Sequence, residues 1–409
     1  MNRRAKLIVV FVSSALAGML LAGSLVGQNS TQDEPYPHLA VFTEVLSRIK
    51  SDYVEEPDLK SVTLGAMNGL LESIDPFASY LNADQFKEYQ EKLGKLKGDV
   101  GLHVAKRFGY VAIVGVLPGS PAAKAGLAPG DAIEAIQHVA TRDMPLAYAE
   151  LLLRGPPGSK VDLTVLQARK AESETISLVR AALVKPELRA QIVAEAVGMV
   201  RPQALDSGRA SEVAAAIHQL QQQGAQRLVL DLRNTATGAP EEGIALAKLF
   251  IDKGLIAYLQ GQKFPRQNLE ANGGAPFGQT PVVVITNRGT AGAAEIAAAA
   301  LLDGKRAKVV GERTFGDAAV RQTIRMADGG ALILSVAKYH SPSGKPIQDT
   351  GVLPDVQMME SEVSVSEEEE EAAPEPKPSV PAPAPSEDKL LRKAIELLTQ
   401  DSAQVAGLR

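Results

Sequence analysis

Side chains able to carry catalysis are scarce in this chain. Its 409 residues include no cysteine, which excludes disulfides, thiolate metal sites and a cysteine nucleophile. None of the five histidines stands beside a Gly-x-Ser-x-Gly motif or a partner at metal-ligand spacing; they are His38, His103, His138, His218 and His340. Ser343 and Lys345 lie two residues apart in a turn, where we expect them to face solvent or cap a sheet. The sequence therefore predicts no metal and no cofactor.

Length and charge limit the class of protein. A chain of this length with 45% hydrophobic residues predicts two or three folded domains with real cores. The net charge is −5, and much of it comes from one acidic run at residues 367–371. A nearly neutral folded part lacks the basic face that would neutralise phosphates, so we expect no nucleic-acid partner.

The N-terminus has the composition of a membrane-directed segment. Arg3, Arg4 and Lys6 precede an uncharged apolar stretch at residues 7–27. A helix of that length would span about 31 Å, enough to cross a bilayer, with the basic flank in the cytoplasm. Residues 1–27 are thus expected to be an uncleaved anchor or a cleaved signal segment. Either alternative places the body in the cell envelope, outside the cytoplasm, with the inner membrane as the anchoring membrane.

Periodicity predicts the order of the domains. Residues 28–37 form a polar linker, and residues 38–94 form a helical unit whose apolar positions recur at helical spacing over 38–53 and 62–74. Residues 95–181 contain short β-runs, such as 110–116 and 161–166, separated by Gly and Pro. Residues 182–358 alternate strand and helix, with strands predicted at 227–232, 281–286 and 307–310. Residues 359–386 are acidic and Pro-rich, which predicts a disordered linker, and 387–409 predict one short helix. The fold class is therefore α/β (α+β), with a central sheet in the last large domain.

The β-rich segment resembles a PDZ domain of the bacterial protease type. The resemblance rests on Gly119-Ser120-Pro121-Ala122-Ala123-Lys124-Ala125-Gly126-Leu127, followed by Pro129-Gly130-Asp131. It implies a peptide groove beside a helix at residues 147–153 and a carboxylate-binding loop within 98–103. The backbone N–H groups of Val100, Gly101 and Leu102 would hold a peptide carboxylate, and Leu102, Val104 and Leu151 would shape the pocket for its last residue. His103 is a candidate ligand contact, and Asp99 brings a negative charge close to the incoming carboxylate.

Residues 36–356 resemble the C-terminal processing (tail-specific) serine peptidases. Residues 73–80 resemble "LDPHSxYL", 230–238 resemble "LDLRNNPGG", 311–316 resemble "GExTFGKG", and 339–343 with 351–355 resemble "YxTPSG … GIxPD". These matches occur in the family's order, together with its arrangement of a helical unit, a PDZ domain and an α/β core.

The resemblance implies a Ser–Lys peptidase whose catalytic positions have been replaced. The family's serine lies in a "TASASE" turn that enters a helix, and its lysine follows twenty-five positions later; these positions are Gly292 and Asp317 here. The glutamine that orients the lysine corresponds to Arg321. Glycine has no nucleophile, and an ionised aspartate cannot act as the neutral lysine base. Gly238 and the N–H of Ala293 would remain as an oxyanion-like pair.

The sequence therefore predicts an exported pseudopeptidase that binds polypeptide C-termini or unfolded segments by strand addition. Two alternatives stay open: an active serine-type endopeptidase with a non-standard nucleophile, and a structural protein of the envelope. A homo-oligomer or an active paralogue is a further candidate partner. For Glu295, which matches a family glutamate, we expect a tie to a neighbouring arginine.

Overall fold

A computed structural model of the chain describes residues 36–359, apart from 143 and 169, and residues 388–406. The chain forms two compact units, residues 1–63 and 64–409. Helix α2 (Tyr36–Asp52) belongs to the first unit, and the boundary falls within α3 (Leu59–Glu72). Among the described helices none combines the length and the apolar character of a membrane span. The expected anchor at residues 7–27 and most of the linker at 359–386 lie outside the described residues.

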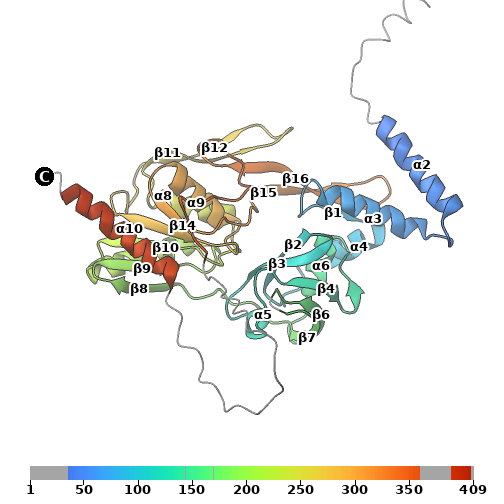
Figure 1. The fold of residues 1–409 in the computed structure, drawn as a ribbon, viewed down its shortest axis with the longest axis horizontal. Coiled ribbons are helices and arrows are strands. Elements are labelled where there is room, and N and C mark those ends of the chain that lie inside the picture. Colours follow the sequence, from blue (N-terminus) through green and yellow to red (C-terminus); the bar gives the residue numbers. More distant parts are fainter. Residues whose placement is uncertain (1–35, 143, 169, 360–387, 407–409) are drawn as a thin grey trace, which may run out of the picture. The chain divides into compact units, whose positions relative to one another are not determined.

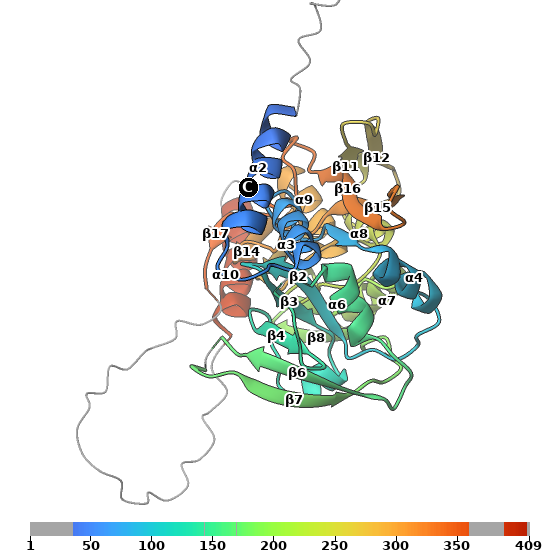
Figure 2. The same cartoon turned by 90° about the vertical axis from the view of Figure 1, so that its right-hand side faces the viewer.

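The β-rich domain is a six-stranded sheet with β2 at one edge, where Lys106 N donates a hydrogen bond to Pro76 O at 2.9 Å. The strand order is β2-β3-β4-β6-β7, with β5 paired to β4. The strands are β2 (Leu102–Arg107), β3 (Tyr110–Val116), β4 (Ala132–Ile136), β5 (Val139–Ala140), β6 (Lys160–Leu166) and β7 (Glu174–Val179). Helix α6 (Leu146–Leu153) lies beside β2 (Figure 2). The short α5 (Pro121–Lys124) is capped by Ser120, whose side chain accepts a hydrogen bond from Ala123 N at 3.1 Å.

The central sheet of the second large domain is mostly parallel. Its order is β17-β14-β13-β10-β9-β8, and only β8 is antiparallel to its neighbour. The strands are β8 (Arg189–Ala194), β9 (Val197–Arg201), β10 (Arg227–Asp231), β13 (Val282–Thr286), β14 (Lys308–Gly311) and β17 (Val356–Gln357). Helices α7 (Arg209–Gln222), α8 (Pro240–Lys248) and α9 (Ala293–Asp303) complete the strand–helix alternation (Figure 1 for α8 and α9, Figure 2 for α7). The predicted mixture of helical, β-rich and α/β parts is confirmed.

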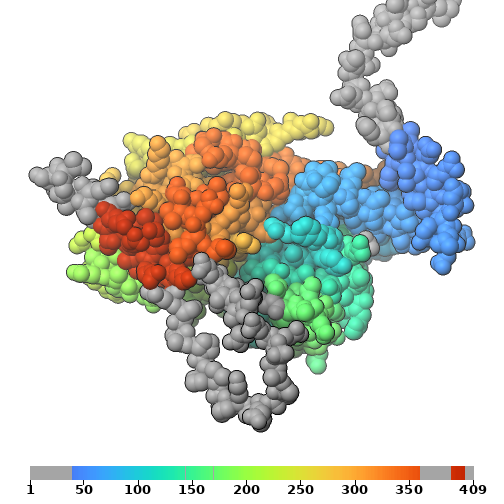
Figure 3. Space-filling view, in the orientation of Figure 1, coloured from blue at the N-terminus to red at the C-terminus, as the bar shows by residue number. Residues whose placement is uncertain are grey.

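Both faces of β13 are covered, as its run of β-branched residues predicts. Val282 and Val284 belong to the core that includes α9. Val283 and Ile285 belong to a second core, which is completed by α10 (Lys389–Ala406). Figure 3 shows α10, in red, lying on the surface of the core domain. No motif in the sequence explains this helix, and the structure shows that it covers the outer face of the central sheet.

A second sheet was not expected from the sequence. It is antiparallel, with the order β1-β16-β11-β12 and with β15 paired to β16. The strands are β1 (Ser79–Leu81), β11 (Lys253–Gln260), β12 (Gln267–Asn272), β15 (Ala319–Arg325) and β16 (Ala331–His340). Strand β1, followed by α4 (Ala83–Lys92), lies in the segment predicted to be helical. Three residues are too few for a strand pattern, so β1 depends on its distant partner β16.

The role of α10 can be tested with Leu390→Ala. Leu390 is fully buried against the sheet, and removal of a buried leucine side chain costs about 2–5 kcal/mol of unfolding free energy. The control is Thr399→Ala on the exposed side of the same helix, for which we expect a change within about 0.5 kcal/mol. Urea unfolding measures both. Equal stability of Leu390→Ala and the wild type would contradict the docking of α10.

Candidate functional site

The turn that leads from β13 into α9 has a backbone geometry that favours glycine. Gly292 has φ 62° and ψ −124°, a conformation that is sparsely populated by residues with a side chain. A Cβ added there would lie 3.7 Å from Asp317 O and 3.8 Å from Ala236 O, which are ordinary contacts. The turn therefore has room for a side chain, and only the backbone opposes one.

The one hydroxyl of this turn has a structural role. Thr290 is fully buried, and its Oγ1 donates a hydrogen bond to Leu232 O at 2.9 Å. The same oxygen accepts a hydrogen bond from Asn287 N at 3.1 Å. Thr290 thus joins the turn to the end of β10 and does not face a substrate.

The carboxylate of Glu295 joins the turn to the loop that contains Asp317. It accepts hydrogen bonds from Gly292 N at 3.0 Å, Gly316 N at 2.7 Å and Asp317 N at 2.8 Å. Thr314 Oγ1 also donates to it. The contact with an arginine that we expected for Glu295 is not what the structure shows; its carboxylate binds backbone amides instead. Burial raises the pKa of Glu295 to about 7, although these hydrogen bonds act in the opposite direction.

Asp317 forms the centre of a charged cluster that includes a residue of the β-rich domain. Its Oδ2 lies 3.0 Å from His103 Nε2, and its Oδ1 accepts a hydrogen bond from Arg321. Burial alone would raise the pKa of Asp317, but the bond from His103 and the charge of Arg321 hold it below its ordinary value. Burial would lower the pKa of His103, and the bond with Asp317 raises it instead. Within the pair, the aspartate is the anion and the histidine the cation.

An aromatic ring supports this cluster from the sequence landmark at residues 73–80. Phe77 stacks on the His103 ring with the centroids 6.2 Å apart, and the Arg321 guanidinium lies 4.1 Å from the Phe77 centroid. Phe77 occupies the position of the histidine in the "LDPHSxYL" motif. Sequence reasoning did not assign a role to Phe77, because the contact joins segments far apart in the chain.

One cavity of about 330 Å³ gathers the five candidate positions of the peptidase resemblance. Gly238, Gly292, Ala293, Asp317 and Arg321 all line it, together with His103 and Thr237. Gly238 has φ 137°, and a Cβ there would lie 2.2 Å from Leu205 O, so this position must be glycine. No serine, cysteine or lysine lines the cavity among the residues that the structure describes.

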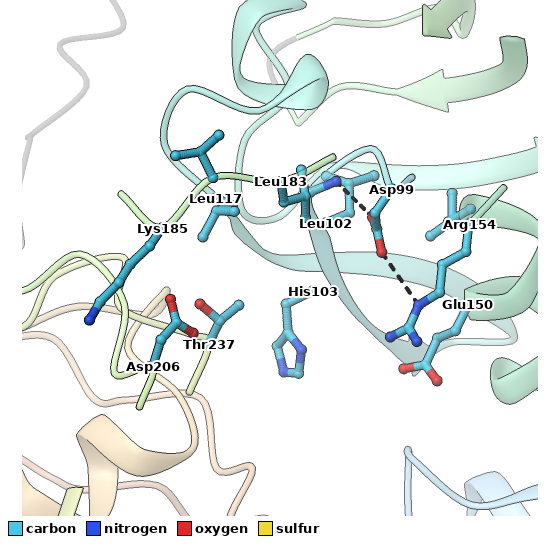
Figure 4. A pocket seen from close by; sticks show the side chains of 13 residues that line it. Asp99, Leu102, His103, Leu117, Glu150, Arg154, Leu183, Lys185, Asp206 and Thr237 are labelled. Carbon is cyan, nitrogen blue, oxygen red and sulfur yellow. Dashed lines mark hydrogen bonds and ion pairs between the residues drawn. The ribbon is translucent and has the colours of Figure 1, made fainter. Parts of the chain in front are cut away.

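A second cavity, of about 530 Å³, lies between β2 and α6 and extends to the core domain (Figure 4). Of the five peptide-binding residues expected from the sequence, Gly101 and Leu102 line it. Val100, Val104 and Leu151 are buried at 0%, 1% and 4% exposure and do not line it.

Two local features explain that difference. A bulge between His103 and Val104 shifts the register of β2, and His103 is the residue that lines the cavity. On α6, the cavity is lined by Glu150, Leu153 and Arg154, whose spacing of three and four residues defines one helical face. That spacing was available in the sequence as a signal.

The geometry defines a class of protein: an α/β domain with a peptidase-type cavity, joined to a β-rich domain with a groove at an edge strand. Residues 196–358 match the model of peptidase family S41, and residues 113–167 match a PDZ domain. A carboxyl-terminal-processing protease of Synechocystis is 35% identical over 316 residues, covering 75% of this chain and 74% of that protein.

Two further comparisons agree. The carboxy-terminal processing protease CtpA of Bacillus subtilis is 32% identical, covering 86% of this chain and 75% of that protein. The solved structure of a photosystem II D1 C-terminal processing protease is similar with a TM-score of 0.64 and 28% identity, covering 80% of this chain and 89% of that one. The chain belongs to peptidase family S41, among the carboxyl-terminal processing proteases that carry a PDZ domain.

The strain at position 292 can be measured with Gly292→Ala. We expect a loss of about 1–3 kcal/mol of unfolding free energy, because the methyl group fits the space but not the backbone conformation. The control is Gly69→Ala, at an exposed helical position with open space, which should gain about 0.5–1 kcal/mol. Thermal or urea unfolding compares them; a stabilised Gly292→Ala would contradict the described turn.

The pair of His103 and Asp317 predicts a pH dependence of stability. The pKa of His103 is raised in the folded state, so protonation of His103 adds to the free energy of unfolding. This stabilisation is complete below the unfolded pKa of about 6.5 and is lost as the pH rises through the folded pKa. The contribution of Asp317, whose pKa is lowered, is lost only as the pH falls below about 3.9. We therefore expect His103→Gln to destabilise the chain more at pH 6 than at pH 8.

Urea unfolding of both proteins at the two pH values provides the measurement. His218→Gln, at an exposed position of α7, is the control and should show no such difference. A penalty for His103→Gln that is independent of pH would show that the pair is not ionic.

Proposed function

We propose that this chain is an exported pseudopeptidase that binds polypeptide segments without cleaving them. The observation that carries the proposal is the pair Gly292 and Asp317, which line the peptidase-type cavity where the resemblance places the serine and the lysine. Acyl transfer by this route needs a hydroxyl that attacks and a base that removes its proton. Neither group is supplied by these two residues.

The charge at position 317 is also the wrong one for this chemistry. A lysine base must be neutral to accept a proton, and the family achieves this by burial. Asp317 is an anion held by His103 and Arg321, so its charge is already balanced within the protein. The cluster supports a structural role for this position, in which it ties the PDZ domain to the core.

An active peptidase with a non-standard nucleophile is the competing hypothesis. The observation that favours it is the contact between His103 and Asp317, which resembles that of the base and the orienting acid in a serine triad. The two nearby threonines oppose it. Thr290 Oγ1 is occupied by Leu232 O, and Thr237 Oγ1 is buried without a hydrogen-bond partner, His103 included.

Peptide binding, in contrast, retains its structural requirements. Strand β2 is the edge of its sheet, and α6 forms the other wall of a cavity large enough for side chains. An extended segment would add to the β2 edge through backbone hydrogen bonds. The proposed export and membrane attachment rest on the basic residues 3–6 and the apolar stretch 7–27.

The proposal predicts that the purified chain neither takes up a fluorophosphonate probe nor cleaves an unfolded protein. A fluorophosphonate reacts only with an activated hydroxyl, and the described cavity offers none. In-gel fluorescence and mass spectrometry of the substrate provide the readouts. Specific labelling, together with cleavage that is lost on His103→Ala, would establish the active-enzyme alternative.

Restored variants serve as the positive control. Gly292→Ser with Asp317→Lys supplies both reacting groups, but Arg321 remains beside the new lysine, and a misplacement of about 1 Å can cost about 100-fold in rate. We expect traces of labelling in this variant and more when Arg321→Gln is added. Full activity in the double variant would show that the site has kept the family's geometry.

A further inference from the structure

The PDZ groove contains a carboxylate of its own, and this bears on which peptides the proposed binding function selects. Asp99 Oδ1 accepts a hydrogen bond from Gly101 N at 2.8 Å, and Asp99 Oδ2 lies 3.4 Å from Arg154 Nε (Figure 4). The PDZ resemblance implies that Gly101 N is one of the backbone groups that would bind the carboxylate of a peptide. Asp99 therefore places an anion where the terminal carboxylate of a bound peptide would lie, and a second anion there is repelled.

The cations around the groove are already engaged. Arg154 is paired with Asp99, and Lys185 donates hydrogen bonds to Glu212 Oε1 at 2.6 Å and Ser207 O at 3.1 Å. His103 is bound to Asp317. A peptide carboxylate would thus meet cations whose positive charge is already partly balanced by acidic groups of the protein.

Glu150 is an acidic residue of the groove, and its carboxylate has no acidic competitor on α6 for a bound cation. Among the described residues its carboxylate forms no hydrogen bond or ion pair, and Figure 4 shows it directed into the cavity near His103. Burial raises the pKa of this carboxyl, and a bound cation would reverse that effect. Asp206 on the opposite wall adds a second negative charge.

The separation of the charged residues along α6 indicates which residues of a bound peptide would lie beside them. Glu150 precedes Arg154 by one turn of α6, which is about 5–6 Å along the helix. Side chains on one face of an added strand are about 6.7 Å apart, two residues along the chain. Beside the Asp99 loop the cavity is lined by leucines, namely Leu102, Leu117, Leu153 and Leu183.

From these contacts we propose that the groove binds an extended internal segment, without a free terminal carboxylate, that carries a basic residue two positions before an apolar one. The basic side chain pairs with Glu150, and the apolar side chain fills the leucine-lined end of the cavity. The ligand class is a Lys-x-Leu or Arg-x-Leu segment. This inference rests on the proposed peptide binding and specifies its selectivity.

Fluorescence anisotropy on the full chain tests it with four short labelled peptides. Two end in Lys-x-Leu, as the amide and as the free acid, and two carry norleucine in place of the lysine. We expect the amidated lysine peptide to bind most tightly, by on the order of tenfold over both its free acid and its norleucine counterpart.

Three variants assign the effect to residues. Glu150→Gln should abolish the preference for lysine, while Asp99→Gly should shift the preference toward the free acid. Glu172→Gln removes the same charge from an exposed position of the β6–β7 hairpin and should change neither preference. Urea unfolding of each variant verifies that it is folded.

The outcomes separate this inference from the proposed function. Tighter binding of the free acids, or equal binding of lysine and norleucine peptides, would overturn the selectivity while peptide binding itself stands. No binding of any of the four at millimolar concentration would overturn both and would leave the structural role in the envelope.

Discussion

Glu295 lies in the first turn of α9, and its buried carboxylate receives hydrogen bonds from both sides of the candidate site. Gly292 donates from the turn, and Gly316 and Asp317 donate from the loop after β14. Without this carboxylate three backbone N–H groups would lose their acceptor in a buried place, at a cost of about 1–3 kcal/mol each. The distance between positions 292 and 317, and with it the shape of the cavity, depends on this one side chain.

The charged cluster around Asp317 joins the PDZ domain to the core domain. A cation at position 317 would be repelled by Arg321, whereas the anion Asp317 attracts both Arg321 and His103. Phe77 stacks against the two cationic partners, so the cluster draws on three segments of the chain. Removal of one partner from a buried charge pair is strongly destabilising, so the stability of the cluster depends on all of its charged members.

The central sheet shows a comparable dependence on distant contacts. Arg233 follows β10 and binds Asp231, and it also reaches Asp388 at the start of α10 with Nη2 at 2.7 Å from Oδ2. Leu390, Ala394 and Leu397 continue the contact as a buried stripe. The charge pair thus orients α10, and the apolar stripe buries the outer face of the central sheet. Without α10 this face of the sheet would be exposed to solvent.

Local sequence patterns determine a good part of the secondary structure and of the domain order of this protein. The β-branched run at 282–286 predicts its strand, because backbone preference and periodicity act over a few neighbouring residues. The order of the family motifs predicts the order of the domains. The sequence likewise determines, whatever the fold, that position 292 has no hydroxyl and position 317 has no amine. Tertiary structure alone decided the pairing of β1 with β16, the place of α10 and the partners of Asp317. It also placed His103 rather than Val104 on the groove, since the bulge in β2 arises from pairing with β3. These features depend on burial and on contacts between distant segments, which no local pattern encodes.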